Sequence, residues 1–238
     1  MRYLMIVQYD GRNYNGFQKQ NKGNTIQNQL EDALKIILKT EVSTVGSGRT
    51  DSKVSAFMQS VHFDVEKEID ITKTLNSLNG ILPSDIKVLS LVASNIHARF
   101  DAKQKTYCYK MYVSNIDLPL YNNALRISPN LDFKAIKKFL RLIVGTHDFA
   151  GFQASGSETE TTVRTITKAK LKKENQYLNF YITGNGFLYK MVRNIVGTML
   201  KVGEHKINLK DLKNTLFSTF KTTSTAKPEF LYLMNVEY

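Results

Sequence analysis

The sequence is poor in cysteine and histidine and has no long apolar run, and each shortage excludes a class of site or protein. Cys108 is the only cysteine, so no internal disulfide can form. The four histidines are scattered and do not indicate a metal site: His62, His97, His147 and His205. No window approaches the roughly 18 to 20 consecutive apolar residues of a membrane-spanning helix, and the amino-terminal residues lack a signal-peptide layout. We therefore expect a cytoplasmic protein without a membrane partner.

The sequence also has fewer acidic than basic residues. The 238-residue chain has 33 basic and 21 acidic residues, and its net charge of +12 favours a polyanionic partner, although a solvated lysine face would give the same surplus. Only 8 of the basic residues are arginine. Five arginines stand outside plain helix surface, where a planar donor fork can bind phosphate or carboxylate: Arg12, Arg49, Arg99, Arg164 and Arg193.

The first half alternates strand and helix patterns. Alternating apolar residues predict strands at 2–9, 42–47, 54–65 and 86–93. Thr25 is placed to cap a helix that buries Ile26, Leu30, Ala33, Leu34, Ile37 and Leu38, and a second helix is expected at 71–78.

The second half also opens with a strand, from Thr106 to about Val113. Asp132 is expected to cap a helix that stops at Gly145. Strands follow at 165–172 and 177–183, then helices at 187–202 and 208–217 and a closing strand at 230–238. Two such halves without βαβ spacing predict an α+β fold with mainly antiparallel sheet, joined near residues 100–106.

The loop from Val45 to Ser52 concentrates chemistry-bearing residues. It sets two glycines, Arg49 and Asp51 between two strands. Asp51 is open to two interpretations: a turn residue that bonds nearby backbone amides, or a carboxylate beside an arginine that acts as a nucleophile.

Gly48-Arg49-Thr50-Asp51 resembles the catalytic motif of the TruA family of tRNA pseudouridine synthases. Similar blocks occur in family order over nearly the whole chain: Asp10-Gly11, Tyr14, Gly16 to Gln20, Leu78 to Ile86, His97 to Ala102, Lys105 to Tyr109, Thr162 to Ile166 and Phe187 to Gly197. A series of this length is far more specific than one motif.

The resemblance implies roles for four catalytic residues. Asp51 would attack the target uridine at the ribose or the base, so that uracil detaches, rotates and rejoins through carbon. Arg49 would take the place of the flipped-out nucleotide or brace its phosphate. Tyr107 would lie against the uracil ring and help to remove the C5 proton, and Arg193 would pair with Asp51. Product and substrate are isomers, so no cofactor is expected.

The resemblance also implies a fold and a partner. We expect two pseudo-similar, ferredoxin- or RRM-like lobes that share a mixed, mainly antiparallel sheet with a central catalytic cleft: residues 1–103 with the aspartate loop, and 104–238, which complete the active site and the dimer interface. The implied assembly is a homodimer acting on the anticodon stem-loop of tRNA. Contacts to RNA are expected from Arg12, Gln18, Lys53, Arg99, Arg164 and Lys190.

Three places depart from the family pattern. Lys53 stands where glycine is usual, Ser55 where histidine is usual, and residues 226–230 differ from the usual proline, glycine and leucine pattern. These departures leave two alternatives open: the same reaction on ribosomal RNA, and an RNA-binding protein without catalysis. Joint retention of Arg49, Asp51, Tyr107 and Arg193 speaks against the second, because a pure binder has no chemical need for a carboxylate that faces phosphates.

Overall fold

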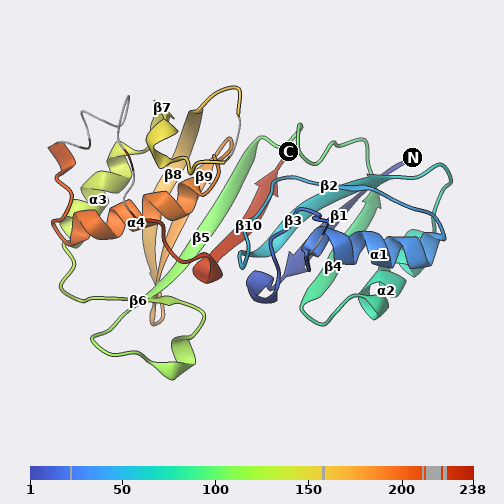
Figure 1. Ribbon diagram of the computed structural model, residues 1–238, viewed down its shortest axis with the longest axis horizontal. Coiled ribbons are helices and arrows are strands. Elements are labelled where there is room, and N and C mark those ends of the chain that lie inside the picture. The colour runs from blue at the N-terminus through green and yellow to red at the C-terminus, as the bar shows by residue number, and fades with distance from the viewer. Residues whose placement is uncertain (22, 157–158, 211, 213–220, 222–223) are drawn as a thin grey trace. The chain divides into compact units, whose positions relative to one another are not determined.

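The computed structural model describes residues 1–21, 23–156, 159–210, 212, 221 and 224–238 (Figure 1). The chain divides into two compact units, one of residues 1–103 with 232–238 and one of residues 104–231. The predicted second lobe, 104–238, differs at its end, because the last seven residues group with the first unit.

The first unit is a sheet with two helices. Its strands follow the order β4-β1-β3-β10, with β2 paired to β3. The strands β1 and β3 pair antiparallel, as do β1 and β4, while β10 runs parallel to β3. The elements are β1 (Arg2–Tyr9), α1 (Ile26–Leu38), β2 (Thr44–Gly46), β3 (Ser55–Asp64), α2 (Ile71–Ile81), β4 (Ile86–Ala93) and β10 (Leu231–Glu237), with the 3-10 turn η1 (Gly11–Asn13).

The core of this unit follows the predicted periodicities. On β1 the alternating residues Tyr3, Met5, Val7 and Tyr9 are all buried. The helix α1 begins where Thr25 caps it, since the Thr25 side chain accepts from the Asn28 amide, and it buries Ile26, Leu30, Ala33 and Leu34. Burial of each such side chain stabilises the fold by about 1.5–3 kcal/mol, so the apolar stripe of α1 determines which face turns to the sheet.

The second unit is an antiparallel sheet in the order β5-β9-β8-β7, with the short β6 parallel to β5. Figure 1 shows α3 and α4 together against this sheet. The elements are β5 (Gln104–Val113), β6 (Leu125–Ile127), α3 (Phe133–Leu142), β7 (Gly145–Asp148), β8 (Val163–Glu174), β9 (Tyr177–Gly184) and α4 (Met191–Gly203), with 3-10 turns η2 (Pro119–Tyr121), η3 (Ala150–Phe152) and η4 (Pro228–Phe230).

Two predicted helix boundaries were wrong. The helix capped by Asp132 ends at Leu142, and Gly145 opens β7 with a φ of +118° rather than serving as the helix stop. The helix predicted from Phe187 begins only at Met191, because Lys190 has a φ of 57° and a left-handed residue cannot continue an α-helix.

The α+β prediction is confirmed, since each unit combines helices with mainly antiparallel sheet. The predicted helix at 208–217 lies largely outside the described residues. Within the described part of the chain, no helix is long and apolar enough to span a membrane.

Candidate active site

Asp51 lies in the loop, residues 47–54, that joins β2 to β3. These strands pair antiparallel, so the loop closes a hairpin. Asp51 is half-buried and Arg49 is exposed. The Val54 amide donates to the Asp51 carbonyl at 3.1 Å, which turns the chain into β3. The structure therefore brings Arg49 and Asp51, both predicted from the sequence, to the end of one hairpin.

A buried glutamine fixes the first part of this loop. Gln59, on β3, is fully buried. Its side-chain oxygen accepts from the Ser47 hydroxyl at 2.5 Å, and its side-chain nitrogen donates to the Gly48 carbonyl at 2.7 Å. A buried polar group without a partner costs about 1–3 kcal/mol, so leaving this arrangement is unfavourable. Gln59 thus holds the backbone just before Arg49.

Thr50 is held by contacts with β1 and with the chain near Phe17. Its hydroxyl lies 2.8 Å from the hydroxyl of Tyr9 on β1, and its carbonyl accepts from the Phe17 amide at 3.1 Å. Gly16 passes so close that a Cβ there would lie 2.8 Å from the Thr50 carbonyl oxygen, and its φ is +98°. Only glycine meets both conditions without strain. The predicted motif around Gly16 and Phe17 therefore supports the backbone of the aspartate loop.

Lys53 adopts a left-handed conformation, with a φ of 68° and an exposed side chain. Its amide donates to the Tyr14 carbonyl at 3.1 Å, and the Ser52 hydroxyl donates to the same oxygen at 3.2 Å. A left-handed residue other than glycine costs roughly 1–2 kcal/mol. This explains why glycine suits the position in the family pattern. The turn itself is intact with lysine.

Ser55, the second departure, is buried and has a structural role. The Gly11 amide donates to the Ser55 hydroxyl at 3.0 Å. A Cβ on Gly11 would lie 1.9 Å from the Val54 carbonyl oxygen, so the Asp10-Gly11 motif packs directly on the end of the loop. The serine satisfies a buried amide at this contact.

Arg12 forms a side-chain ion pair with Asp10. Its Nε lies 2.9 Å and its Nη2 2.5 Å from the carboxylate. The hydrogen bond from Arg12 holds the pKa of Asp10 below its ordinary value. Because the guanidinium is already engaged, RNA phosphate would have to compete with Asp10 for it.

Tyr14 links two of the sequence blocks. Its hydroxyl donates to the Asp85 carboxylate at 2.6 Å, and the Asp10 amide donates to the Asp85 carbonyl at 2.9 Å. Burial is the main cause that raises the pKa of Tyr14, and the bond to Asp85 adds to it. The phenol therefore stays protonated and remains a donor.

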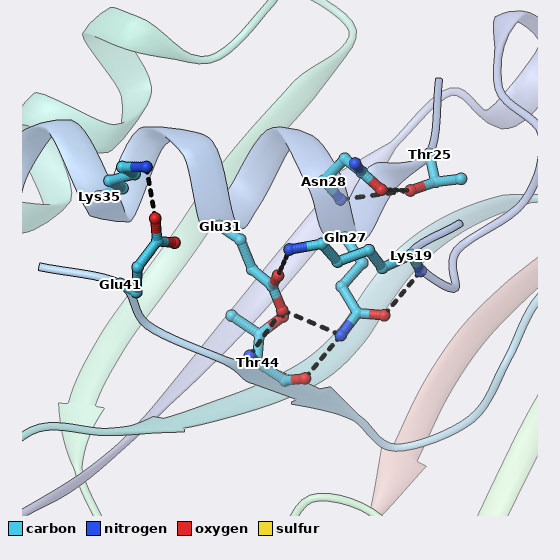
Figure 2. Close-up of polar contacts among 8 residues, drawn as sticks. All are labelled: Lys19, Thr25, Gln27, Asn28, Glu31, Lys35, Glu41 and Thr44. Carbon is cyan, nitrogen blue, oxygen red and sulfur yellow. Dashed lines mark hydrogen bonds and ion pairs between the residues drawn. The ribbon is translucent and has the colours of Figure 1, made fainter. Parts of the chain in front are cut away.

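A buried carboxylate ties α1 to the strand that leads into the aspartate loop (Figure 2). Glu31 is 7% exposed and accepts from the amide and the hydroxyl of Thr44, the first residue of β2, at 2.9 and 3.1 Å. Gln27 donates to Glu31 at 3.1 Å and to the Thr44 carbonyl at 2.7 Å. The Lys19 ammonium lies 2.8 Å from Glu31 and supplies the counter-charge. We call these four residues the Glu31 network; it fixes where β2 begins.

Tyr107 lies in the second unit, on β5 opposite Ile182 of β9. It is 8% exposed, and Phe187 meets its ring edge-on, with centroids 5.3 Å apart and an interplanar angle of 90°. Edge-to-face pairs contribute about 0.5–1.5 kcal/mol beyond burial, so Phe187 fixes the orientation of the ring.

Arg193, also in the second unit, lies in the first turn of α4. Its Nε donates to the Ala226 carbonyl at 2.8 Å, and the Ala226 amide donates to the Arg193 carbonyl at 3.1 Å. Gly197, one turn later, permits this approach, because a Cβ there would lie 2.1 Å from the Ser224 carbonyl oxygen. The departure at Ala226 therefore keeps backbone contacts that position Arg193.

Arg164, on β8, is half-buried and bonds to the Thr161 and Val163 carbonyls at 2.9 and 2.7 Å and to the Thr159 hydroxyl at 3.3 Å. Burial lowers its pKa. All of these partners are neutral oxygens, and no carboxylate among the described residues forms an ion pair with it. A guanidinium whose described partners are all neutral suits an anion such as phosphate.

The other predicted RNA contacts lie at the surface. Gln18, Lys53 and Arg99 are exposed. Lys190 is half-buried, and its ammonium lies 4.8 Å from the centroid of the Tyr189 ring. In the part of the chain that the structure describes, no group of three or more His, Cys, Asp or Glu is arranged to hold a metal ion.

Sequence reasoning missed the residues that support the loop. Gln59, Glu31 and Gln27 are polar, so the periodicity of apolar residues cannot find them. The available signal was weak: a glutamine within the strand pattern 54–65, and a glutamate between the buried Leu30 and Ala33 of the predicted helix.

Comparison with known proteins identifies related sequences. A family model described as tRNA pseudouridine synthase matches residues 5–101 and 139–238. The tRNA pseudouridine synthase A of Thermoanaerobacter sp. (strain X514) is 39% identical over 244 residues, which is 100% of both chains. The protein of the same name from Caldicellulosiruptor saccharolyticus is 40% identical over 99% of this chain and 98% of its own length. That of Streptococcus mutans serotype c is 37% identical over 100% of this chain and 99% of its own.

Proposed function

Because this chain belongs to the tRNA pseudouridine synthase family, we propose that it isomerises uridine to pseudouridine in tRNA, with the anticodon stem-loop as its target. The family resemblance read from the motifs is confirmed. The relatives named above match the chain over nearly its full length and all have tRNA in their names. This favours tRNA over ribosomal RNA as the substrate and an enzyme over a binding protein.

The observation that carries the proposal is the support around Asp51. Its neighbour Thr50 is held by Tyr9 and Phe17, and the chain before Arg49 is held by Gln59. A half-buried carboxylate on a backbone held by such contacts is preorganised, and preorganisation lowers the cost of reaching the reacting geometry.

In the proposed reaction Asp51 attacks the target nucleoside at the ribose or the base. If Asp51 attacks the ribose C1′, the bond from C1′ to N1 breaks, uracil rotates, and C5 then bonds to C1′ as the bond from Asp51 to C1′ breaks. If Asp51 adds to the base, C1′ is likewise transferred from N1 to C5, and the bond from Asp51 to the base breaks when the carboxylate leaves. A proton leaves C5, with help from Tyr107, and a proton is gained at N1. Atoms and electrons balance, so the reaction requires no redox partner and no cofactor.

The arginines would stabilise the flipped-out nucleotide. A base inside a stem is out of reach, and extruding it costs a few kcal/mol. Arg49, exposed beside Asp51, would brace the phosphate or fill the place of the extruded nucleotide. Arg193 would pair with the Asp51 carboxylate. Arg164, whose partners are neutral, would bind a phosphate of the RNA.

The test is tritium release from C5-labelled uridine in total tRNA and, separately, in ribosomal RNA. Wild-type protein should release tritium from tRNA, and Asp51→Ala should abolish release without loss of the folded state. Asp32→Asn, an exposed carboxylate on α1, is the matched control and should retain activity. Tritium release from ribosomal RNA alone would identify ribosomal RNA, and not tRNA, as the substrate. Tight binding of RNA without any release would favour the non-catalytic alternative.

We extend the proposal to two further properties of the protein. We expect a homodimer, because an enzyme that grips a large folded RNA gains from two binding surfaces, and we expect a cytoplasmic location, where tRNA is found. Light scattering after gel filtration would give the mass of the particle. A 27.2 kDa species at all protein concentrations would contradict the dimer.

A further inference from the structure

Phe100 is exposed to an unusual degree. It is 75% exposed, and the only other aromatic residue among the exposed large side chains in the described part of the molecule is Tyr189, at 39%. Phenylalanine side chains are mostly buried, because removal of their apolar surface from water stabilises the fold. An isolated exposed phenylalanine can occur by chance, so the structure around it decides whether the exposure has a use.

The turn that carries Phe100 is held by a set of hydrogen bonds. The ring nitrogen Nδ1 of His97 accepts from the Phe100 amide at 3.1 Å and from the Arg99 amide at 3.3 Å. The Asp101 carboxylate accepts from the His97 amide at 2.8 Å, and the Asp101 amide donates to the His97 carbonyl at 3.1 Å. The backbone at Phe100 is thus ordered before any partner binds.

The same turn is anchored to the core. The Ala98 amide donates to Nδ1 of the buried His62 at 3.0 Å, and the Ala98 carbonyl accepts from the Tyr238 hydroxyl at 2.9 Å. Ala98 itself is fully buried. An exposed ring on an anchored turn loses little conformational entropy on binding, which is the requirement for a preformed contact.

The ring of Phe100 has one supported face. It stacks on His97, with centroids 4.3 Å apart and an interplanar angle of 23°. At 75% exposure the rest of the ring remains open to solvent. The guanidinium carbon of Arg99 lies 5.7 Å from the ring centroid, and no carboxylate among the described residues pairs with this arginine. A flat ring with an unneutralised cation beside it matches a nucleotide, which has a flat base and a phosphate.

We propose that Phe100 is a stacking platform for an unpaired nucleobase of the RNA substrate, with Arg99 on the adjoining phosphate. The proposal rests on the proposed function, since it takes the partner to be RNA. Aromatic stacking tolerates any base, so the platform adds affinity and places the strand without reading its sequence. The net charge of +12 favours such a polyanionic partner over a neutral or basic protein surface.

Affinity measurements test the stacking. Phe100→Ala should weaken binding of tRNA by about 10-fold, within the range of base–aromatic stacking. Phe100→Tyr should keep the affinity, and Phe100→Leu, which is apolar without a π-face, should lose most of it. Leu120→Ala is the matched control: this side chain is 88% exposed, in the second unit, and its loss should leave affinity unchanged.

A fluorescence experiment separates the possible occupants. The chain has no tryptophan, so Phe100→Trp introduces a single indole reporter. Stacking of a base should quench its emission on addition of tRNA, whereas Leu120→Trp should not respond. Quenching or a blue shift that appears without RNA as protein concentration rises would show that a second copy covers the residue, and this would overturn the proposal.

Tritium release in the same variants keeps the two proposals distinct. If wild-type protein releases tritium from tRNA but Phe100→Ala and Phe100→Leu bind and react like wild type, the platform is refuted and the enzymatic function stands. If wild-type protein shows no release from any RNA, the proposed function fails, whatever the fluorescence shows.

Discussion

Replacing Glu31 by glutamine tests how much the Glu31 network contributes to the stability of the fold. The substitution keeps the size of the side chain but removes the charge and puts an amide donor where one oxygen accepted from Lys19, Thr44 or Gln27. Hydrogen bonds to a charged group contribute roughly 1.5–3 kcal/mol each, and a buried donor left unpaired costs about 1–3 kcal/mol. Lys19 is half exposed and can turn to water, so its share is small. We expect a loss of roughly 2–3 kcal/mol, since glutamine retains part of the network.

Glu41→Gln is the control for this prediction. Glu41 also pairs with a residue of α1, Lys35, but its side chain is exposed (Figure 2). Thermal unfolding of both variants should show a fall of roughly 5–10 °C for Glu31→Gln and no resolvable change for Glu41→Gln. Turnover of labelled tRNA, measured on folded protein at low temperature, should also fall for Glu31→Gln, with unchanged RNA affinity.

Equal stability of the two variants would refute the reasoning about the buried carboxylate. A stability loss for Glu31→Gln with wild-type turnover would show that the network supports the fold but does not position the aspartate loop.

Three further predictions concern single residues. Lys53→Gly should raise stability by about 1 kcal/mol in urea unfolding, because glycine adopts the left-handed φ of 68° without strain; an unchanged or lower midpoint would contradict the assignment. Gly16→Ala should destabilise the protein and reduce tritium release, since a Cβ would lie 2.8 Å from the Thr50 carbonyl oxygen; activity equal to wild type would show that the loop can shift without consequence. Hydrogen bonds from Lys172 above all lower the pKa of Glu174 to about 2, so its contribution to stability is present above the ordinary value near 4.5 and is lost as pH falls through about 2. Glu174→Gln should therefore flatten the loss of stability between those pH values, by a small amount because the ion pair is partly exposed to solvent, and an unaltered acid profile would argue against the pairing.

The sequence predicts most of the elements because apolar periodicity and local capping determine them. Strands β1 and β4 and helix α1 were found nearly at their observed bounds, and Thr25 caps α1 as expected. The start of α4 was misplaced, because nothing in the sequence marks Lys190 as left-handed; this conformation is a non-glycine exception. The short strands β6 and β7 were not predicted.

In the candidate site too, some residues could be predicted from the sequence and others could not. The motif around Asp51 was visible in the sequence, because it concentrates glycine, arginine and aspartate in one loop. The partners that hold the loop were not visible, since Gln59 and Glu31 act through contacts distant in the chain. The roles of Tyr107 and Arg193 remain predictions.

The position of β10 has a consequence for how the protein is made. Tyr232 and Leu233 pair in parallel with Ser55 and Ala56, the first residues after the aspartate loop, and the Lys103 amide donates to the Glu237 carbonyl at 2.8 Å. A nascent chain folds from its amino terminus as it is synthesised, yet this unit needs the last residues to be translated. During synthesis the aspartate loop therefore stays beside an unfilled strand position until the second unit has emerged, so a ribosome-bound or prematurely terminated chain has no complete first unit.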